Sequence, residues 1–337
     1  MDPLTQGVVA AVASQQVSQR KHIAYATLLG FFSGMTPDLD VLIKSDVDPL
    51  LALEYHRHFT HSLFFIPVGG LLCALVFYAL IFRRPSMQAQ GFTFKRVWLY
   101  CTLGYATHGL LDACTTYGTQ LLWPLSDMRV AWNTISIIDP IFTLPLLTFI
   151  VIAALKKSKR FAHIALVWVV AYTAMGIIQR ERAESVGLEL AASRGHTPLR
   201  LEAKPSFANI VVWKTVYSTD DAFYVDAVKV GLGQRIYEGA SVPKLNVETA
   251  FPWLDEHSQQ RKDIERFRWF SNRYLAVSPQ DPTQIIDVRY SMIPNEIRGL
   301  WGIQLDERAN SNQHVNYVFG RDRDQTVFKQ LWKMIVE

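Results

Sequence analysis

Ionisable residues that interrupt apolar runs constrain this chain more than any other feature of its sequence. All of them are Asp or His, and they stand at the ends of the first two apolar runs or inside the third: Asp38, Asp40, His56, His61, His108 and Asp112. Ionisable groups at membrane depth are costly and usually mark a functional site. Asp and His are also ligands of hydrolytic metal centres. The sequence therefore predicts a metal site within or beside a membrane.

Apolar residues are distributed unevenly over the 337 residues. Residues 1–180 carry long apolar runs, residues 181–204 read as a connecting helix and linker, and residues 205–337 read as a soluble β-rich domain. We therefore expect an α-helical polytopic membrane domain of about five to six helices. A soluble α+β domain with an antiparallel sheet is expected to follow it.

Several apolar segments approach the roughly 20 residues that cross a bilayer. They are Leu63–Phe82, Val97–Cys114, Ile137–Leu155 and Phe161–Ile178. Two shorter segments, Leu4–Ser14 and Ile23–Met35, precede them. These form either a hairpin of two short helices or one interfacial helix followed by a span that extends through Ile43.

Clusters of Lys and Arg alternate along the chain with loops that are poor in both residues. The clusters lie at residues 20–21, 83–84, 95–96 and 156–160. Loops rich in Lys and Arg stay in the cytoplasm. The ends near Asp40, His56–His61, Asp112 and Asp139 then face the side of the membrane opposite to the cytoplasm, as does the soluble domain. Because all candidate ligands fall on one side, we expect them to form one site.

The second half of the chain shows short β-type runs separated by Gly, Pro, Asn and Asp. We expect strands at Asn209–Tyr217, Ala222–Val230, Gln284–Tyr290, Leu300–Leu305 and Val315–Phe319. A helix is expected to continue through Gln179–Ser193 and stop at Gly195. Glu256–Phe270 is expected to form a second helix.

Several classes of protein are excluded by composition and motifs. The net charge is +4, and no basic tract interleaved with aromatics suggests a nucleic-acid partner. The three cysteines fall in apolar segments, so no disulfide framework is implied. No basic region precedes an apolar run at Met1–Gln6, so a cleaved signal peptide is not expected. The zincin motif His-Glu-x-x-His, the Gly-x-Ser-x-Gly elbow and a Walker phosphate loop do not occur.

Two of the candidate pairs have a structural as well as a functional interpretation. His108 and Asp112 are four residues apart and share one face of a helix, where they either grip a metal or hydrogen-bond each other. Asp38 and Asp40 follow Pro37, where they either cap a helix end or bind metal. We assign Asp40 to the metal and keep Asp38 as the alternative ligand and as a catalytic residue.

The segment His56-Arg57-His58-Phe59-Thr60-His61-Ser62 is the most specific motif in the chain. His56 and His61 are predicted ligands, and His58 is predicted to be incidental. Arg57 is predicted to hold an anionic phosphate oxygen bidentately. Thr60 and Ser62 are expected to cap the following helix. Farther along, Asp139-Pro140 reads as a helix start, with a supporting or second-metal role for Asp139 as the alternative.

Together these motifs resemble the YdjM-like (YbcI-like) family of inner-membrane metal-dependent hydrolases. The matching elements are Met1–Thr5, Pro37–Asp40, His56–Arg57, Phe59–Ser62, His108–Asp112 with Thr116–Gly118, Trp132–Asn133 and Ser136–Pro140. The resemblance implies a distant similarity to zinc-dependent phospholipases C and single-strand-specific zinc nucleases. Gln6 stands where relatives often carry His, which implies one or two ions rather than a cluster of three.

The sequence thus predicts a metal-dependent hydrolase of phosphoesters that uses a metal-activated water. The predicted metal ligands are Asp40, His56, His61, His108 and Asp112, with Arg57 and Asp38 in catalytic roles. Zinc suits these ligands, and manganese or iron would accept the same set. The expected partners are membrane lipids and a phospholipid-like substrate. The rival hypothesis is a non-catalytic metal-binding scaffold whose soluble domain recruits a partner.

Overall fold

The computed structural model describes residues 1–320 and 325–337, and the chain divides into two compact units. Unit 1 comprises Met1–Leu42 and Tyr55–Ile177, and unit 2 comprises Ile43–Glu54 and Ile178–Glu337. The second boundary falls inside the longest helix, α8 (Lys159–Ser193). The sequence did not predict that the short segment between the Asp38–Asp40 and His56–His61 motifs groups with unit 2.

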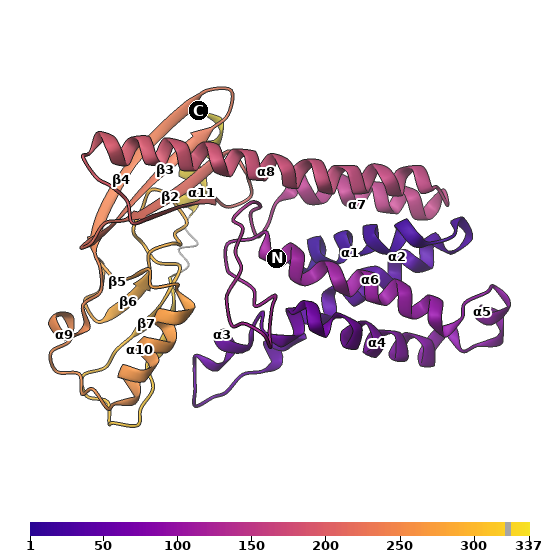
Figure 1. Cartoon of the computed structure of the whole chain (residues 1–337), viewed down its shortest axis with the longest axis horizontal. Helices are drawn as coiled ribbons and strands as arrows, with labels where there is room; N and C mark the ends of the chain where they lie inside the picture. Colours follow the sequence, from indigo (N-terminus) through magenta and orange to yellow (C-terminus); the bar gives the residue numbers. More distant parts are fainter. Residues whose placement is uncertain (321–324) are drawn as a thin grey trace. The chain divides into compact units, whose positions relative to one another are not determined.

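Unit 1 is helical, as predicted. Its elements are α1 (Pro3–Val17), η1 (Arg20–His22), α2 (Ile23–Met35), η2 (Thr36–Leu42), η3 (Phe59–His61), η4 (Leu63–Phe65), α4 (Ile66–Phe77), η5 (Tyr78–Phe82), α5 (Pro85–Ala89), α6 (Phe94–Ala113) and α7 (Pro140–Leu155). The helix α3 (Leu51–Tyr55) belongs to unit 2 except for its last residue, Tyr55. Helices α1, α2, α4 and α6 run side by side in Figure 1, and α6 contacts the other three. Their buried core includes Leu29, Ala74, Tyr100 and Cys101.

Helix starts in unit 1 follow from short capping motifs. The Asp2 carboxylate accepts a hydrogen bond from the Thr5 backbone N–H at 3.0 Å, with Pro3 in the first turn of α1. The Asp139 carboxylate accepts from the backbone N–H groups of Ile141 and Phe142 at 3.1 and 3.2 Å. Such caps satisfy N–H groups that have no partner within the helix. The prediction that Asp139-Pro140 begins a helix is confirmed.

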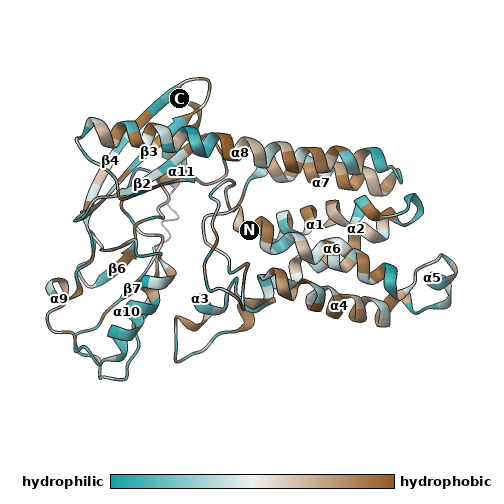
Figure 2. Ribbon diagram, viewed as in Figure 1, coloured by the Kyte–Doolittle hydropathy of each residue, from teal (hydrophilic) through white to brown (hydrophobic). Residues whose placement is uncertain are grey.

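Two helical stretches in the described part of the chain are long and apolar enough to cross a membrane. They are Leu63–Phe82 and Lys159–Ser193, both of which contain or match a predicted span. Helix α7 is apolar but shorter. In Figure 2 hydrophobic residues dominate α4, α7 and the first half of α8. The count of about five to six membrane helices is not confirmed, because the other helices do not meet this length and hydropathy.

Unit 2 contains two antiparallel four-stranded sheets where one was predicted. The first has the order β1 (Arg200–Pro205), β2 (Val212–Ser218), β3 (Ala222–Val230) and β4 (Gln234–Pro243). The second has the order β5 (Leu275–Val277), β6 (Gln284–Asp287), β7 (Trp301–Gln304) and β8 (Asn316–Phe319). The helices are α9 (Val247–Ala250), α10 (Gln259–Phe270) and α11 (Gln325–Val336). Apolar side chains of both sheets, including Phe223, Val225, Ala276 and Ile286, share one buried core.

Local sequence explains which elements were predicted and which were missed. Helix α8 ends at Ser193, and Gly195 has φ +74°, a left-handed conformation that suits glycine after a helix. Strand β1 begins inside the segment 181–204, which was expected to be a connecting helix and linker. Strand β4 carries mostly exposed side chains, so it lacks the alternation of apolar residues that marks a strand. Its pairing with β3, from Ala222 opposite Pro243 to Val230 opposite Gln234, defines it instead.

Candidate metal centre

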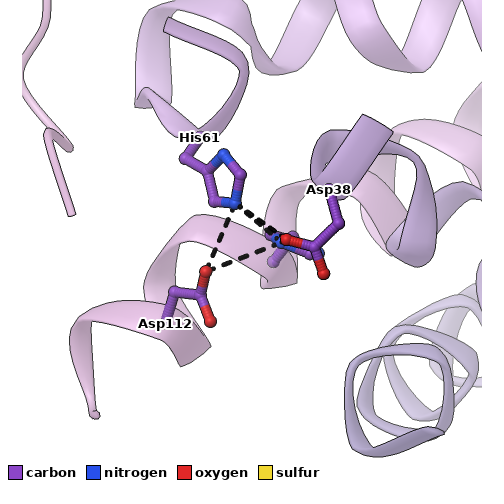
Figure 3. A group of neighbouring side chains, drawn as sticks. Asp38, His61 and Asp112 are labelled. Carbon is purple, nitrogen blue, oxygen red and sulfur yellow. Dashed lines mark hydrogen bonds and ion pairs between the residues drawn. The ribbon is translucent and has the colours of Figure 1, made fainter. Parts of the chain in front are cut away.

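Side chains from three separate segments of unit 1 meet at one point. Asp38 comes from η2, His61 from η3, and His108 and Asp112 from α6. Each offers one ligand atom, and these atoms lie within 4.8 Å of one another. Figure 3 shows the Asp38, His61 and Asp112 side chains pointing toward one another. The predicted convergence of the three motifs is therefore present in the structure.

The two imidazole rings define the centre of this cluster. The Nε2 atoms of His61 and His108 are 2.9 Å apart. The Oδ1 atom of Asp38 lies 3.4 Å from Nε2 of His61 and 3.3 Å from Nε2 of His108. The Oδ2 atom of Asp112 lies 3.3 Å and 3.6 Å from the same two nitrogens. Two nitrogens and two oxygens thus surround a common point.

Glycine at position 109 permits this meeting. His108 and Asp112 are one turn apart on α6, as their spacing predicts. A β-carbon at Gly109 would clash with the carbonyl oxygen of His61. The Tyr105 hydroxyl, one turn earlier on α6, donates to the carbonyl oxygen of Thr60 at 2.7 Å. The His61 segment therefore lies directly against α6, and sequence analysis did not single out Gly109 or Tyr105.

Hydrogen bonds to the outer nitrogens orient both rings. The Nδ1 atom of His108 bonds to the backbone carbonyl oxygen of Gly34, which can only accept, so Nδ1 carries the proton. The Nδ1 atom of His61 lies 3.2 Å from the Asp40 carboxylate and 2.9 Å from the Thr60 hydroxyl. A carbonyl or carboxylate on one ring nitrogen is the usual support for a histidine whose other nitrogen binds metal. In both rings Nε2 is the atom turned toward the cluster.

The polar atoms of the cluster do not satisfy one another's hydrogen-bonding capacity. Two Nε2 atoms at 2.9 Å can share at most one proton. The buried Oδ2 atom of Asp112 has no hydrogen-bond partner among the described residues. An unsatisfied buried acceptor costs about 1–3 kcal/mol. A cation among these four atoms would remove that cost, and two Asp with two His is a suitable set for a divalent metal. The residues present therefore fit the predicted metal.

A second possible group of ligands shares Asp38 with the first. It comprises Asp38, Asp40 and His56. The Asp40 carboxylate lies 2.8 Å from Nδ1 of His56 and also accepts from the Arg57 backbone N–H at 2.9 Å. Asp40, which was predicted to bind the metal directly, also contacts Nδ1 of His61 and so helps to orient that ring. Asp38, the predicted alternative ligand and catalytic residue, is the member common to both groups.

Arg57, the predicted phosphate-binding residue, lies buried beside the cluster. Its guanidinium is only 3 % exposed, and Nε lies 3.1 Å from Oδ2 of Asp112. Its Nη1 donates to the Thr115 hydroxyl at 2.8 Å, and its plane lies 4.8 Å from the centre of the Tyr117 ring. A buried carboxylate requires a compensating charge, and Arg57 supplies it to Asp112. A guanidinium held in this way supports the cluster, and its predicted contact with a phosphate oxygen stays a prediction.

Other residues of the motifs take supporting positions. Gln6 donates through Nε2 to Oδ1 of Asp112 at 2.8 Å, at the position where the resemblance expects His. The Ser62 hydroxyl accepts from the Phe65 N–H at 3.2 Å, which confirms its predicted capping role. His58 lies outside both ligand groups and packs against the Trp123 ring at 5.3 Å between centroids. Thr60 bonds to Asp40 instead of acting as a helix cap.

The carboxylates give the cluster a strong preference for positive charge. Burial alone would lower the pKa of His61, but the nearby carboxylates of Asp112, Asp38 and Asp40 raise it to about 10. Burial favours the neutral form of Asp38, yet hydrogen bonds with His108 and His61 lower its pKa overall. Hydrogen bonds with His56 and His61 likewise lower the pKa of Asp40 despite its burial. All these effects stabilise ionised carboxylates at neutral pH.

Exposure differs among the side chains of the two ligand groups. The side chains of His61, His108 and Asp112 are fully buried, whereas Asp38 is 22 % and His56 25 % exposed. A molecule that approaches the cluster therefore meets Asp38 and His56 first. A catalytic metal site keeps one position accessible, while a structural site is closed by protein ligands.

Comparison with known proteins assigns the helical part of the chain to a family. Residues 1–183 match the family described as YdjM inner membrane protein. The Inner membrane protein YbcI of Escherichia coli (strain K12) is 37% identical over 112 residues, which cover 32% of this chain and 60% of YbcI. The Uncharacterized protein YfhP of Bacillus subtilis (strain 168) is 24% identical over 276 residues, 80% of this chain and 78% of YfhP.

No solved structure matches this chain. The matched family covers every residue of both ligand groups. The predicted similarity to zinc-dependent phospholipases C is not shown by these comparisons and stays a prediction.

Proposed function

This chain belongs to the YdjM inner membrane protein family, and we propose that it is a membrane-embedded, metal-dependent hydrolase of phosphoesters. The observation that carries the proposal is the convergence of Asp38, His61, His108 and Asp112, whose ligand atoms lie within 4.8 Å of one another. The substrate is a phospholipid-like molecule or another phosphoester held close to the membrane. The ligand-bearing ends of the helices face the periplasm in this proposal, because the basic loops at the opposite ends stay in the cytoplasm.

The protein would hold one or two divalent ions, with zinc as the first candidate and manganese or iron as alternatives. The first ion would bind Asp38, His61, His108 and Asp112, and the second would share Asp38. A bound ion supplies Lewis-acid chemistry, which neutralises phosphate charge and brings the pKa of a water near 7. The remaining contributions come from the chain itself.

Each supporting residue has a defined task in this proposal. The Gly34 carbonyl and the Asp40 carboxylate hold the two rings with Nε2 toward the cluster. Arg57 neutralises Asp112 from the buried side. Because this guanidinium is already paired with Asp112, the charge that binds a phosphate would come from the ions. Substrate would enter on the side where Asp38 and His56 are exposed.

A second candidate function is supported by a different observation. Three of the four residues in the first group are fully buried, and four protein ligands can close a structural metal site. The protein would then be a metal-stabilised membrane scaffold whose unit 2 recruits a partner. The two functions differ in one measurable property, which is turnover.

Metal content and turnover of the full chain in detergent test both functions. We expect bound metal and metal-dependent cleavage of bis(p-nitrophenyl) phosphate or of phospholipid vesicles. His61→Ala should reduce turnover by more than about a hundredfold, since mutation of residues that only orient ligands typically costs 10–100-fold. His257→Ala, at an exposed histidine of unit 2, is the matched control and should change neither property.

The outcomes separate the two functions. Bound metal without turnover, lost in His61→Ala, would support the scaffold and contradict the hydrolase. A chain without stoichiometric metal would contradict both. Turnover that is unchanged in His61→Ala would show that the cluster is not the active site.

A further inference from the structure

The segment Ile43–Glu54 connects the two motifs that supply ligands to the second group. It begins after Asp40 and ends just before His56, yet it groups with unit 2. It is not an open loop: the Leu50 side chain is only 1 % exposed. The Ser45 hydroxyl accepts from the backbone N–H groups of Val47 and Asp48 at 3.1 Å each. The connection between two ligand motifs is therefore an ordered part of the β-rich unit.

One arginine of unit 2 binds this segment at two points. Arg266, on α10, donates through Nη1 and Nη2 to the two oxygens of Asp48 at 3.0 and 2.8 Å. Its Nε donates to Oε1 of Glu54 at 2.6 Å. Paired N–H groups on a carboxylate give the strongest and most directional ion pairs. A single guanidinium thus fixes both the middle and the end of the segment.

The guanidinium is itself held in place by unit 2. Its Nη1 also donates to Oδ1 of the fully buried Asp263 at 2.9 Å. The other oxygen of Asp263 binds Nδ1 of His314 at 2.8 Å and the Val315 N–H at 3.2 Å. The network reaches from α10 to the chain before β8. Isolated surface ion pairs contribute little, whereas networks with fixed geometry contribute more.

We propose that Arg266 is a positioning residue for the second ligand group, Asp38, Asp40 and His56. This inference rests on the proposed metal centre. With Asp48 and Glu54 fixed, the free chain is reduced to residues 43–47 on one side, after η2, and Tyr55 on the other. Each doubling of a flexible loop makes closure about threefold less favourable. Release of Arg266 therefore weakens the placement of His56 against Asp40.

The first ligand group depends less on this contact. His108 and Asp112 lie on one helix, and His61 is held against α6 through Gly109 and Tyr105. Loss of Arg266 should therefore weaken the second metal-binding step by about three- to tenfold, a range set by the loop estimate. The first step should stay within about twofold. A mere loss of overall stability would weaken both steps alike.

Metal titration and hydrogen exchange of the full chain in detergent test this inference. Zinc affinity for each step and exchange of the Arg57 amide, which bonds to Asp40, are compared for wild type, Arg266→Ala and Arg266→Lys. Arg268→Ala is the matched control, because Arg268 lies on the same helix and pairs with the exposed Glu265. We expect faster exchange and a weaker second step in Arg266→Ala, partial recovery in Arg266→Lys, and no change in the control.

The two readouts keep this inference separable from the proposed function. If wild type binds no zinc, the proposed function fails, and exchange of the Arg57 amide still decides whether Arg266 positions the segment. Unchanged exchange in Arg266→Ala would overturn the inference, with or without metal. Equal weakening of both binding steps, or the same effect from Arg268→Ala, would also overturn it.

Discussion

Both units bury ionisable side chains, but they satisfy them differently. In unit 2 the buried Lys214 ammonium donates to the Ser291 hydroxyl and to the carbonyl oxygens of Pro294 and Glu296 at 2.9–3.2 Å. In unit 1 two imidazole nitrogens face each other at 2.9 Å, and the Asp112 Oδ2 atom has no hydrogen-bond partner among the described residues. Buried polar groups in proteins are normally satisfied. The unsatisfied Asp112 oxygen beside two facing imidazole nitrogens, rather than burial itself, indicates where a ligand belongs.

The two units also differ in their buried arginine–aspartate pairs. Arg289 donates to both oxygens of Asp287 through Nε and Nη2, the shortest at 2.6 Å, and both side chains are buried. In unit 1 the Arg57 Nε atom lies 3.1 Å from Oδ2 of Asp112, and neither atom forms a hydrogen bond within the described part of the chain. The first pair is complete by itself. The second leaves a carboxylate oxygen that can still take a cation.

The largest effect on stability is expected where the unit 2 pair is broken. Asp287→Ala leaves the Arg289 guanidinium buried without its partner, which costs about 3–5 kcal/mol of unfolding free energy. Metal binding in unit 1 should stay unchanged. Urea unfolding and zinc titration measure both quantities. Asp220→Ala, at an exposed position, should lie within about 0.5 kcal/mol of wild type. A small loss in Asp287→Ala would mean that the buried pair of unit 2 is no more structural than the cluster.

In unit 1 we expect a substitution to weaken metal binding strongly and to change stability little. His108→Leu removes one of the four ligand atoms of the cluster and should weaken zinc binding by more than about a hundredfold. The unfolding free energy of the metal-free chain should change by less than about 1 kcal/mol, because functional sites are not optimised for stability. Calorimetric zinc titration and urea unfolding in chelator provide the measurements, with His163→Leu at an exposed histidine as control. Strong destabilisation of the metal-free chain would indicate a structural cluster.

A smaller effect, visible only as pH changes, is expected at Lys214. Burial lowers the pKa of Lys214 to about 7 from its ordinary 10.5, although Asp287 and Glu296 oppose the shift. Between these values the unfolded chain binds more protons than the folded chain, so stability rises with pH. The gain is at most about 1.4 kcal/mol per pH unit.

The matched experiment is urea unfolding between about pH 7 and pH 9.5, the interval over which the Lys214 proton is lost on folding. Lys214→Met should flatten the rise of stability with pH, because it removes the titrating group. Lys262→Met, at an exposed lysine of α10, should keep the wild-type slope. An identical slope in Lys214→Met would show that another group causes the pH dependence.

The cluster was predictable where its geometry is local. The spacing of His108 and Asp112 requires only a helix, and the structure has both on α6. The role that each of the other residues takes in the cluster was not predictable. Asp38 and Asp40 are two residues apart, and the course of η2 rather than their identity puts Asp38 into both ligand groups. The pairing of Arg57 with Asp112 joins positions 55 residues apart, which no spacing rule reveals.

The fold shows the same division. Strands with apolar side chains, such as β3 (Ala222–Val230), were predicted within their observed bounds. Strand β4 was missed because its side chains are mostly exposed and pairing with β3 supplies its definition. No role was predicted for the segment Ile43–Glu54, because its attachment depends on Arg266, more than 200 residues later in the chain.

The sequence by itself determined that this protein has an apolar helical part, a β-rich part and an excess of Asp and His at the ends of its apolar runs. These are properties of composition and short spacing, which local backbone geometry converts into helices, strands and shared faces. The tertiary structure alone decided which carboxylate meets which imidazole, and that Arg57 is already paired. It did so because packing such as that at Gly109, and the need to satisfy each buried charge, act between residues that are distant in the chain.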